Sequence, residues 1–122
     1  MEKKKVIYID DESVNLKLFE MNFSSYYDLT ICEYPEEALE KIKNENIEIV
    51  ITDYKMPTMN GMELIEEVKK VNEEAKCMIL TGFLENELLL DQSKIYKFIT
   101  KPYGRKEVII NHINSAISDL AV

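Results

Sequence analysis

Five polar groups in this sequence each follow a short apolar run, and their types suggest a specific chemistry. They are the carboxylates of Asp10, Asp11 and Asp53, the hydroxyl of Thr81 and the ammonium of Lys101. Carboxylates that lie close together repel one another, and a divalent cation removes that repulsion. Oxygen ligands without histidine or cysteine favour Mg²⁺ (or Mn²⁺), which readily shares its coordination shell with a phosphate. The three acids therefore predict a metal site if the fold brings them together.

The other two groups suit a phosphoryl anion. Lys101 supplies a positive charge and Thr81 a hydroxyl donor, while backbone amides near Gly82 can approach closely because glycine has no side chain. Metal, lysine and hydrogen-bond donors recur in phosphoryl transfer, where positioning and charge neutralisation carry most of the catalysis. A carboxylate beside Mg²⁺ can act as the nucleophile that receives the phosphoryl group. The residues thus predict an aspartyl-phosphate site.

Apolar runs alternate with helical stripes and predict the strands that would position these groups. Five short runs look like strands covered on both faces: Val6–Ile9, Leu29–Cys32, Ile47–Thr52, Cys77–Leu80 and Phe98–Ile99. Strand followed by helix, repeated five times, predicts an α/β fold with a parallel sheet and helices on both faces. The carboxyl ends of the strands share one edge, where ligands bind, so the five polar groups should meet there.

Five helices are expected. The first has a broad apolar face, made of Val14, Leu18 and Met21 with Leu16, Phe19 and Phe23 beside them. Three others are marked by apolar stripes: Ala38, Leu39 and Ile42 after Pro35; Leu64, Ile65, Val68 and Val71; and Ile109, Ile113, Ala116, Ile117 and Leu120. The segment from Phe83 to Ile95 is interpreted as the fourth helix, although Leu90 interrupts its stripe of leucines.

Length and composition limit the remaining classes. A chain of 122 residues fits one domain, residues 1–122, and its net charge of −8 disfavours a general grip on nucleic acid or an anionic membrane. Cys32 and Cys77 lie far apart without CxxC spacing, which argues against a disulfide framework or zinc site. The apolar stretches are too short for a membrane span or signal peptide, so a cytoplasmic location is expected.

The ordered set of these motifs resembles a response-regulator receiver domain over essentially the whole chain. The motifs are Asp10-Asp11, Asp53 with Met56-Pro57 and Gly61, Thr81, and Lys101-Pro102. The resemblance implies a doubly wound, flavodoxin-like architecture of five parallel strands and five helices. It also implies a phosphorylation-activated signalling switch, which is no true enzyme because it catalyses only its own phosphorylation and dephosphorylation.

Site roles follow from the resemblance, position by position. Asp53 is implied to accept the phosphoryl group, and Thr81 and Lys101 to hold its oxygens. The metal ligands are implied to be Asp53, Asp11 directly, Asp10 mainly through water, and the backbone carbonyl of Lys55.

Three further features come from the same resemblance. Phe98 stands at the aromatic switch position, and the peptide bond between Lys101 and Pro102 is expected to be cis. Lys55 and Phe83 flank the approach of the hydrolytic water and should tune the lifetime of the phosphoryl group.

Partners are implied in the same way. The phosphoryl donor would be a histidine kinase or a histidine phosphotransfer protein, and phosphorylation would change the surface of the fourth helix, fifth strand and fifth helix to control a partner or output domain. The resemblance also allows a phosphorylation-dependent dimer. The text around Thr81-Gly82-Phe83 and from Ile95 to Tyr103 is similar to receivers attached to HD-type phosphodiesterase outputs.

Two rival functions share parts of the pattern. A Mg²⁺-dependent phosphatase of the haloacid-dehalogenase type also forms an aspartyl phosphate, but its second acid, two residues on, is Lys55 here, and no cap insertion is present. A flavodoxin-like cofactor binder would need a Ser/Thr/Gly-rich phosphate loop after the first strand, where this chain has Asp10-Asp11-Glu12-Ser13. Steady phosphatase turnover, yellow flavin colour or a single stable phosphorylation would distinguish the three.

Overall fold

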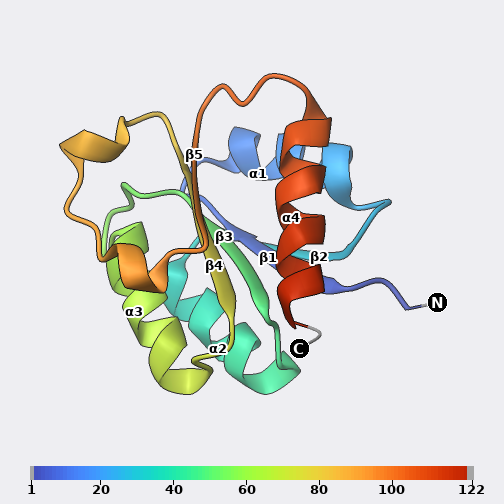
Figure 1. Ribbon diagram of the computed structural model, residues 1–122, viewed down its shortest axis with the longest axis horizontal. Helices are drawn as coiled ribbons and strands as arrows, with labels where there is room; N and C mark the ends of the chain where they lie inside the picture. The colour runs from blue at the N-terminus through green and yellow to red at the C-terminus, as the bar shows by residue number, and fades with distance from the viewer. Residues whose placement is uncertain (1, 121–122) are drawn as a thin grey trace.

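A five-stranded parallel sheet forms the centre of the computed structural model, which describes residues 2–120 (Figure 1). The strands are β1 (Lys5–Ile9), β2 (Asp28–Cys32), β3 (Ile49–Thr52), β4 (Lys76–Thr81) and β5 (Lys97–Thr100), in the order β2-β1-β3-β4-β5. The helices are α1 (Ser13–Phe23), α2 (Pro35–Glu45), α3 (Gly61–Val71) and α4 (Lys106–Leu120). The predicted α/β architecture with its doubly wound parallel sheet is confirmed.

Two layers of helices explain why the strands are apolar throughout. The helices α1 and α4 pack on one face of the sheet, and α2 and α3 on the other (Figure 1). All four residues of β3 are buried, as continuous burial on both faces requires. Cys32 and Cys77 are free thiols in the apolar cluster on the α2 and α3 face. Within residues 2–120, none of the helices has the length and apolar character needed to cross a membrane.

The expected helix between Phe83 and Ile95 is wrong. Two single 3₁₀ turns stand there instead, η1 (Glu85–Glu87) and η2 (Gln92–Lys94), joined by extended chain. A helix cannot place the consecutive leucines 88–90 on one buried face, and the extended chain instead lets Leu90 reach the core while Leu89 is 89% exposed. The last helix of the chain is therefore the fourth, α4, rather than the fifth.

The predicted apolar face of α1 is wrong in half of its members. Leu16, Phe19 and Phe23 are buried against the sheet, as their spacing of three and four residues predicts. Val14, Leu18 and Met21 instead point outward and are 66%, 52% and 71% exposed. The helix therefore carries a second, exposed apolar row.

The start of α3 is fixed locally, which matters for the loop that leads to it. Asn60 and Glu63 form a reciprocal capping box: the Asn60 side chain accepts from the Glu63 amide at 2.8 Å, and Glu63 accepts from the Asn60 amide at 2.9 Å. Gly61 follows, and its amide donates to the carbonyl of Tyr54 at 2.7 Å. The loop after β3 is thus tied to the helix on its far side.

Candidate functional site

The carboxyl ends of four strands converge on one edge of the sheet, and backbone hydrogen bonds hold the residues that follow them. The Asp53 amide donates to the carbonyl of Ile9 at 2.9 Å, and the Lys101 amide donates to the carbonyl of Thr81 at 2.7 Å. The sheet ladder therefore continues one residue beyond the strands. This continuation places the acids and Lys101 side by side, as the strand pattern predicted.

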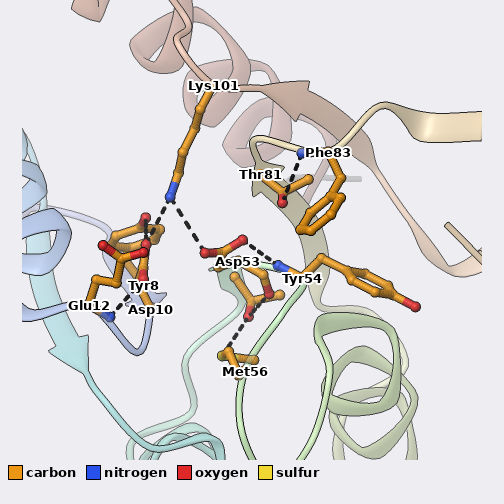
Figure 2. Close-up of polar contacts among 10 residues, drawn as sticks. Tyr8, Asp10, Glu12, Asp53, Tyr54, Met56, Thr81, Phe83 and Lys101 are labelled. Atoms are coloured by element: carbon orange, nitrogen blue, oxygen red, sulfur yellow. Dashed lines mark hydrogen bonds and ion pairs between the residues drawn. The ribbon is translucent and has the colours of Figure 1, made fainter. Parts of the chain in front are cut away.

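Three carboxylates gather there: Asp10, Asp11 and Asp53 each offer an oxygen within 4.8 Å of the others. The Lys101 ammonium lies between two of them, 2.9 Å from Asp10 Oδ2 and 3.7 Å from Asp53 Oδ2 (Figure 2). All the ligand atoms in this cluster are carboxylate oxygens, which fit Mg²⁺ and suit neither a soft metal nor a structural zinc.

Asp10 is the most constrained of the three acids. It is fully buried; its Oδ1 accepts from the Glu12 amide at 3.0 Å, and its Oδ2 accepts from the Tyr8 hydroxyl at 2.6 Å as well as from Lys101 (Figure 2). Burial alone would raise the pKa of Asp10, but these hydrogen bonds outweigh it and hold the pKa below its ordinary value. Asp10 is therefore a fixed negative charge.

Asp53 is less well compensated. Burial raises its pKa above the ordinary value, and the Asp10 charge adds to that rise while Lys101 and the Tyr54 amide oppose it. The Tyr54 amide donates to Asp53 Oδ1 at 2.7 Å and orients the carboxylate. The charge of Asp53 thus needs a further cation more than that of Asp10 does.

An open cavity of about 640 Å³ lies in front of Asp53. Asp11, Thr81 and Lys101 line it, whereas Asp10 lies behind it. Lys55 and Phe83 stand at the cavity too, with the Lys55 ammonium 5.8 Å from the centre of the Phe83 ring. The cavity can admit a small anion between the Asp53 carboxylate and this pair.

Thr81 and Phe98 lie on the neighbouring strands β4 and β5, and Thr81 lines the cavity. Thr81 is buried, and its hydroxyl accepts from the Phe83 amide at 3.4 Å. Phe98 is half-buried and packs against the apolar cluster on the α2 and α3 face. The Lys101–Pro102 bond is cis, which confirms that prediction.

Sequence reasoning missed two residues that the geometry places against the site. Tyr8 precedes Asp10 by two residues, and because alternate strand residues share a face, this spacing was a signal that its hydroxyl would meet the carboxylate. Gly61 was named only as part of the sequence motif, and its structural role was not predicted. In the structure, a side chain at this position would collide with the Asp53 backbone.

Comparisons with known proteins agree with this geometry. The family described as "Response regulator receiver domain" matches residues 6–114. The chain is 29% identical over 119 residues to the transcriptional regulatory protein GlrR of Escherichia coli (strain K12), covering 95% of this chain and 27% of GlrR. It is 27% identical over 110 residues to the chemotaxis protein CheY of Thermotoga maritima, covering 87% of this chain and 92% of that protein.

A response regulator receiver domain protein from Clostridium thermocellum has a similar crystal structure, with a TM-score of 0.86, 29% identity and 95% of each chain covered. The chain spans about a quarter of the length of the first curated relatives it matches. Since the family match covers most of the chain and the acidic cluster lies where the fold predicts, the chain belongs to the response-regulator receiver domains of two-component signalling, which are signalling switches rather than true enzymes.

Proposed function

We propose that this chain accepts a phosphoryl group on Asp53 from a histidine kinase or a histidine phosphotransfer protein, in a Mg²⁺-dependent reaction. The observation that carries the proposal is the position of the Lys101 ammonium, within 4 Å of both Asp10 and Asp53 beside an open cavity. Residues 1–122 would act as one phosphoacceptor domain in the cytoplasm. A downstream partner or output domain would bind or respond to the phosphorylated state. The phosphorylated chain could also form a dimer.

The metal would be held by Asp11 and Asp53, by the backbone carbonyl of Lys55, and through water by Asp10. Asp11 lines the cavity and Asp10 lies behind it, which supports this division of roles. When bound, Mg²⁺ neutralises charge on the carboxylates and on the phosphoryl oxygens.

The transfer itself needs few protein groups. An Asp53 carboxylate oxygen forms a bond to phosphorus, and the bond from phosphorus to the donor nitrogen breaks, with the electron pair leaving on that nitrogen. The Tyr54 amide orients the nucleophile. Lys101 balances the negative charge on the phosphoryl oxygens, and the Thr81 hydroxyl turns to donate to one of them.

The signal would leave the site through Thr81 and Phe98. When the Thr81 hydroxyl moves toward the phosphoryl group, space opens that the Phe98 ring can fill, since Phe98 has no hydroxyl that keeps it at the surface. The surface that changes would be formed by the segment 83–95, β5 and α4, because the structure has 3₁₀ turns where the fourth helix was expected. Turns of this kind re-fold at lower cost than a packed helix.

The phosphatase alternative is not favoured by the geometry. A haloacid-dehalogenase-type enzyme needs a general acid two residues after the nucleophile, and here Lys55 stands at that position and faces Phe83. The carboxylic acid that carries the proton in those enzymes is therefore missing at this position, and repeated turnover lacks its proton carrier.

Intact-mass spectrometry tests the proposal. Acetyl phosphate with Mg²⁺ should add a single phosphoryl group to the wild-type chain and none to Asp53→Asn, which preserves the shape of the side chain but lacks the nucleophilic oxygen. Omission of Mg²⁺ should also prevent labelling. Equal labelling of Asp53→Asn would show that another residue is the acceptor.

Replacing Asp11 with alanine should weaken Mg²⁺ binding by at least about tenfold, because a hard cation loses one of its few carboxylate ligands. Isothermal titration calorimetry measures the affinity directly. Glu20→Ala, which removes the same charge from the exposed side of α1, is the matched control and should bind Mg²⁺ like wild type. Wild-type affinity in Asp11→Ala would exclude Asp11 as a ligand.

A further inference from the structure

The Tyr8 hydroxyl is a polar group inside an otherwise apolar layer. Its ring is 1% exposed and stacks on Phe19, with centroids 4.1 Å apart and planes inclined by 19°. The hydroxyl emerges from this layer at a single point, where it donates to Asp10 Oδ2 at 2.6 Å (Figure 2). Burial of a hydroxyl is unfavourable in free energy, and the short hydrogen bond to the Asp10 carboxylate offsets this cost.

We propose that Tyr8 is a positioning residue for phosphoryl transfer, which holds Asp10 in place so that Lys101 is free to move to Asp53. The proposal rests on the proposed acceptance of a phosphoryl group by Asp53. It concerns a residue outside the motif set and outside the cavity, which acts through Asp10 and Lys101 rather than on the phosphoryl group.

Asp10 and Asp53 share the Lys101 ammonium. The ammonium lies 2.9 Å from Asp10 Oδ2 and 3.7 Å from Asp53 Oδ2, so in this structure it is closer to Asp10. A phosphoryl group on Asp53 adds negative charge on that side of the lysine. The ammonium can follow the added charge only if Asp10 can do without it.

Asp10 has no access to bulk solvent. Its side chain is fully buried, so bulk water cannot replace a lost partner, and the water that would link Asp10 to Mg²⁺ would be present whether or not Lys101 stays. Oδ1 is held by the Glu12 amide at 3.0 Å, and Oδ2 has two donors, Tyr8 and Lys101. When Lys101 leaves, the Tyr8 hydroxyl is the donor that remains on Oδ2, and the buried oxygen stays hydrogen-bonded.

Without the Tyr8 hydroxyl, Lys101 would be the remaining side-chain donor to Oδ2 among the described contacts. Its departure would then leave a buried carboxylate oxygen without a protein donor, which is unfavourable in a low-dielectric interior. The lysine would therefore stay on Asp10, and the phosphoryl group on Asp53 would lose its cation. Removal of one hydroxyl should thus impair the phosphorylated state while leaving the unphosphorylated site assembled.

The variant that tests this is Tyr8→Phe, which retains the ring and its stacking on Phe19. Its matched control is Tyr27→Phe, since Tyr27 is also buried and its hydroxyl donates to Asn114 Oδ1 at 2.9 Å, away from the acidic cluster. Three quantities are measured in each protein. They are the Mg²⁺ affinity by calorimetry, the affinity for beryllofluoride, a phosphoryl mimic, by ¹H–¹⁵N spectra at saturating Mg²⁺, and the rate of phosphorylation by acetyl phosphate by intact mass.

We expect Tyr8→Phe to bind beryllofluoride about tenfold more weakly than wild type and to be phosphorylated by acetyl phosphate more slowly by a similar factor. Its Mg²⁺ affinity should stay within about twofold, because the direct ligands Asp11 and Asp53 are untouched and the Glu12 amide still holds Asp10, which would act through water. Tyr27→Phe should match wild type in all three. Unchanged beryllofluoride affinity in Tyr8→Phe would overturn the inference, and so would a loss confined to Mg²⁺ affinity, which would assign Tyr8 to the metal site.

A measurement on the wild-type protein guards against misfolding of the variant. The Tyr8 hydroxyl proton, bonded to a buried carboxylate, should give a resonance protected from exchange, and it should stay protected after beryllofluoride is added. Loss of protection on addition would overturn the inference. Failure of the wild-type chain to bind beryllofluoride or accept a phosphoryl group would instead refute the proposed function, so the two failures are distinguishable.

Discussion

Replacing Gly61 with alanine is expected to lower the melting temperature by about 5–10 °C and to slow phosphorylation of Asp53. A Cβ at position 61 would overlap the backbone carbonyl oxygen of Asp53 and stand 3.1 Å from Tyr54 Cα. These are backbone atoms, so they cannot turn aside as the end of a side chain can. Relief requires the loop after β3, and the acceptor with it, to move.

Two opposing terms set the size of the effect. Alanine is the better helix former by about 1 kcal/mol, and Gly61 is the first residue of α3, where that gain is smallest. Overpacking against fixed atoms costs about 1–3 kcal/mol. The start of α3 cannot retreat, because the capping box and the bond from the Gly61 amide to the Tyr54 carbonyl pin it. The steric term should therefore exceed the helical gain.

The control for Gly61→Ala is Gly82→Ala, in the loop on the other side of the cavity. Nothing lies within 4 Å of a Cβ at position 82, so that variant should melt within about 1–2 °C of wild type. Thermal unfolding followed by circular dichroism, with intact-mass labelling by acetyl phosphate, measures both effects. A Gly61→Ala protein as stable as wild type would show that the loop yields cheaply and does not fix Asp53.

The sheet was predictable because the apolar pattern of each strand lies within a few consecutive residues and is repeated at every position. Strands buried on both faces need apolar residues at every position, and β3, with Ile49, Val50 and Ile51, has no other plausible reading. The segment 83–95 lacked this redundancy. Leu84 and Leu88 fit a helix by spacing and Leu90 does not, and the deciding contacts are tertiary. Leu90 packs against the core, and the Asp91 amide lies 3.3 Å from Met62 Sδ of α3.

The sequence predicted which residues meet at the candidate site, but not the hydrogen bonds that their side chains form there. Asp10, Asp53 and Lys101 follow strands, so sheet topology alone brings them together. Which of their contacts are the shortest and strongest depends on side-chain rotamers and on distances of a few tenths of an ångström. In the sequence, only its hydroxyl and its spacing of two residues from Asp10 distinguish Tyr8 from other buried strand residues. The two faces of α1 were confused because both carry large apolar side chains at helical spacing.

Slow loss of the phosphoryl group is the second large effect expected. Hydrolysis needs a water in line with phosphorus, on the side opposite the Asp53 oxygen. Lys55 and Phe83 both line the cavity on which Asp53 opens, with the Lys55 ammonium 5.8 Å from the Phe83 ring centre. Such a pair favours its own closed arrangement, because a cation over an aromatic face is attracted to it. In that closed arrangement the pair should shield the line of attack, and neither side chain offers a carboxylate or amide oxygen that could orient a water molecule.

Opening this pair should shorten the lifetime. We expect Lys55→Asn and Phe83→Ala each to speed decay of the phosphoryl group by about tenfold, a lowering of the barrier by about 1.4 kcal/mol. Asparagine should act both by removing the cation and by offering an amide that holds water. The double variant should gain less than the product of the two, because either change alone breaks the same contact.

The matched control is a lysine–aromatic pair at the other end of the sheet. The Lys76 ammonium lies 5.7 Å from the Tyr96 ring centre, at the start of β4, so Lys76→Asn breaks an equivalent contact far from the acceptor. Decay of the isolated phosphorylated proteins, followed by intact mass after removal of the donor, should be unchanged in Lys76→Asn. If Lys55→Asn and Phe83→Ala decay at that same rate, the pair does not shield phosphorus, and the lifetime is set by Mg²⁺ and the carboxylates around Asp53.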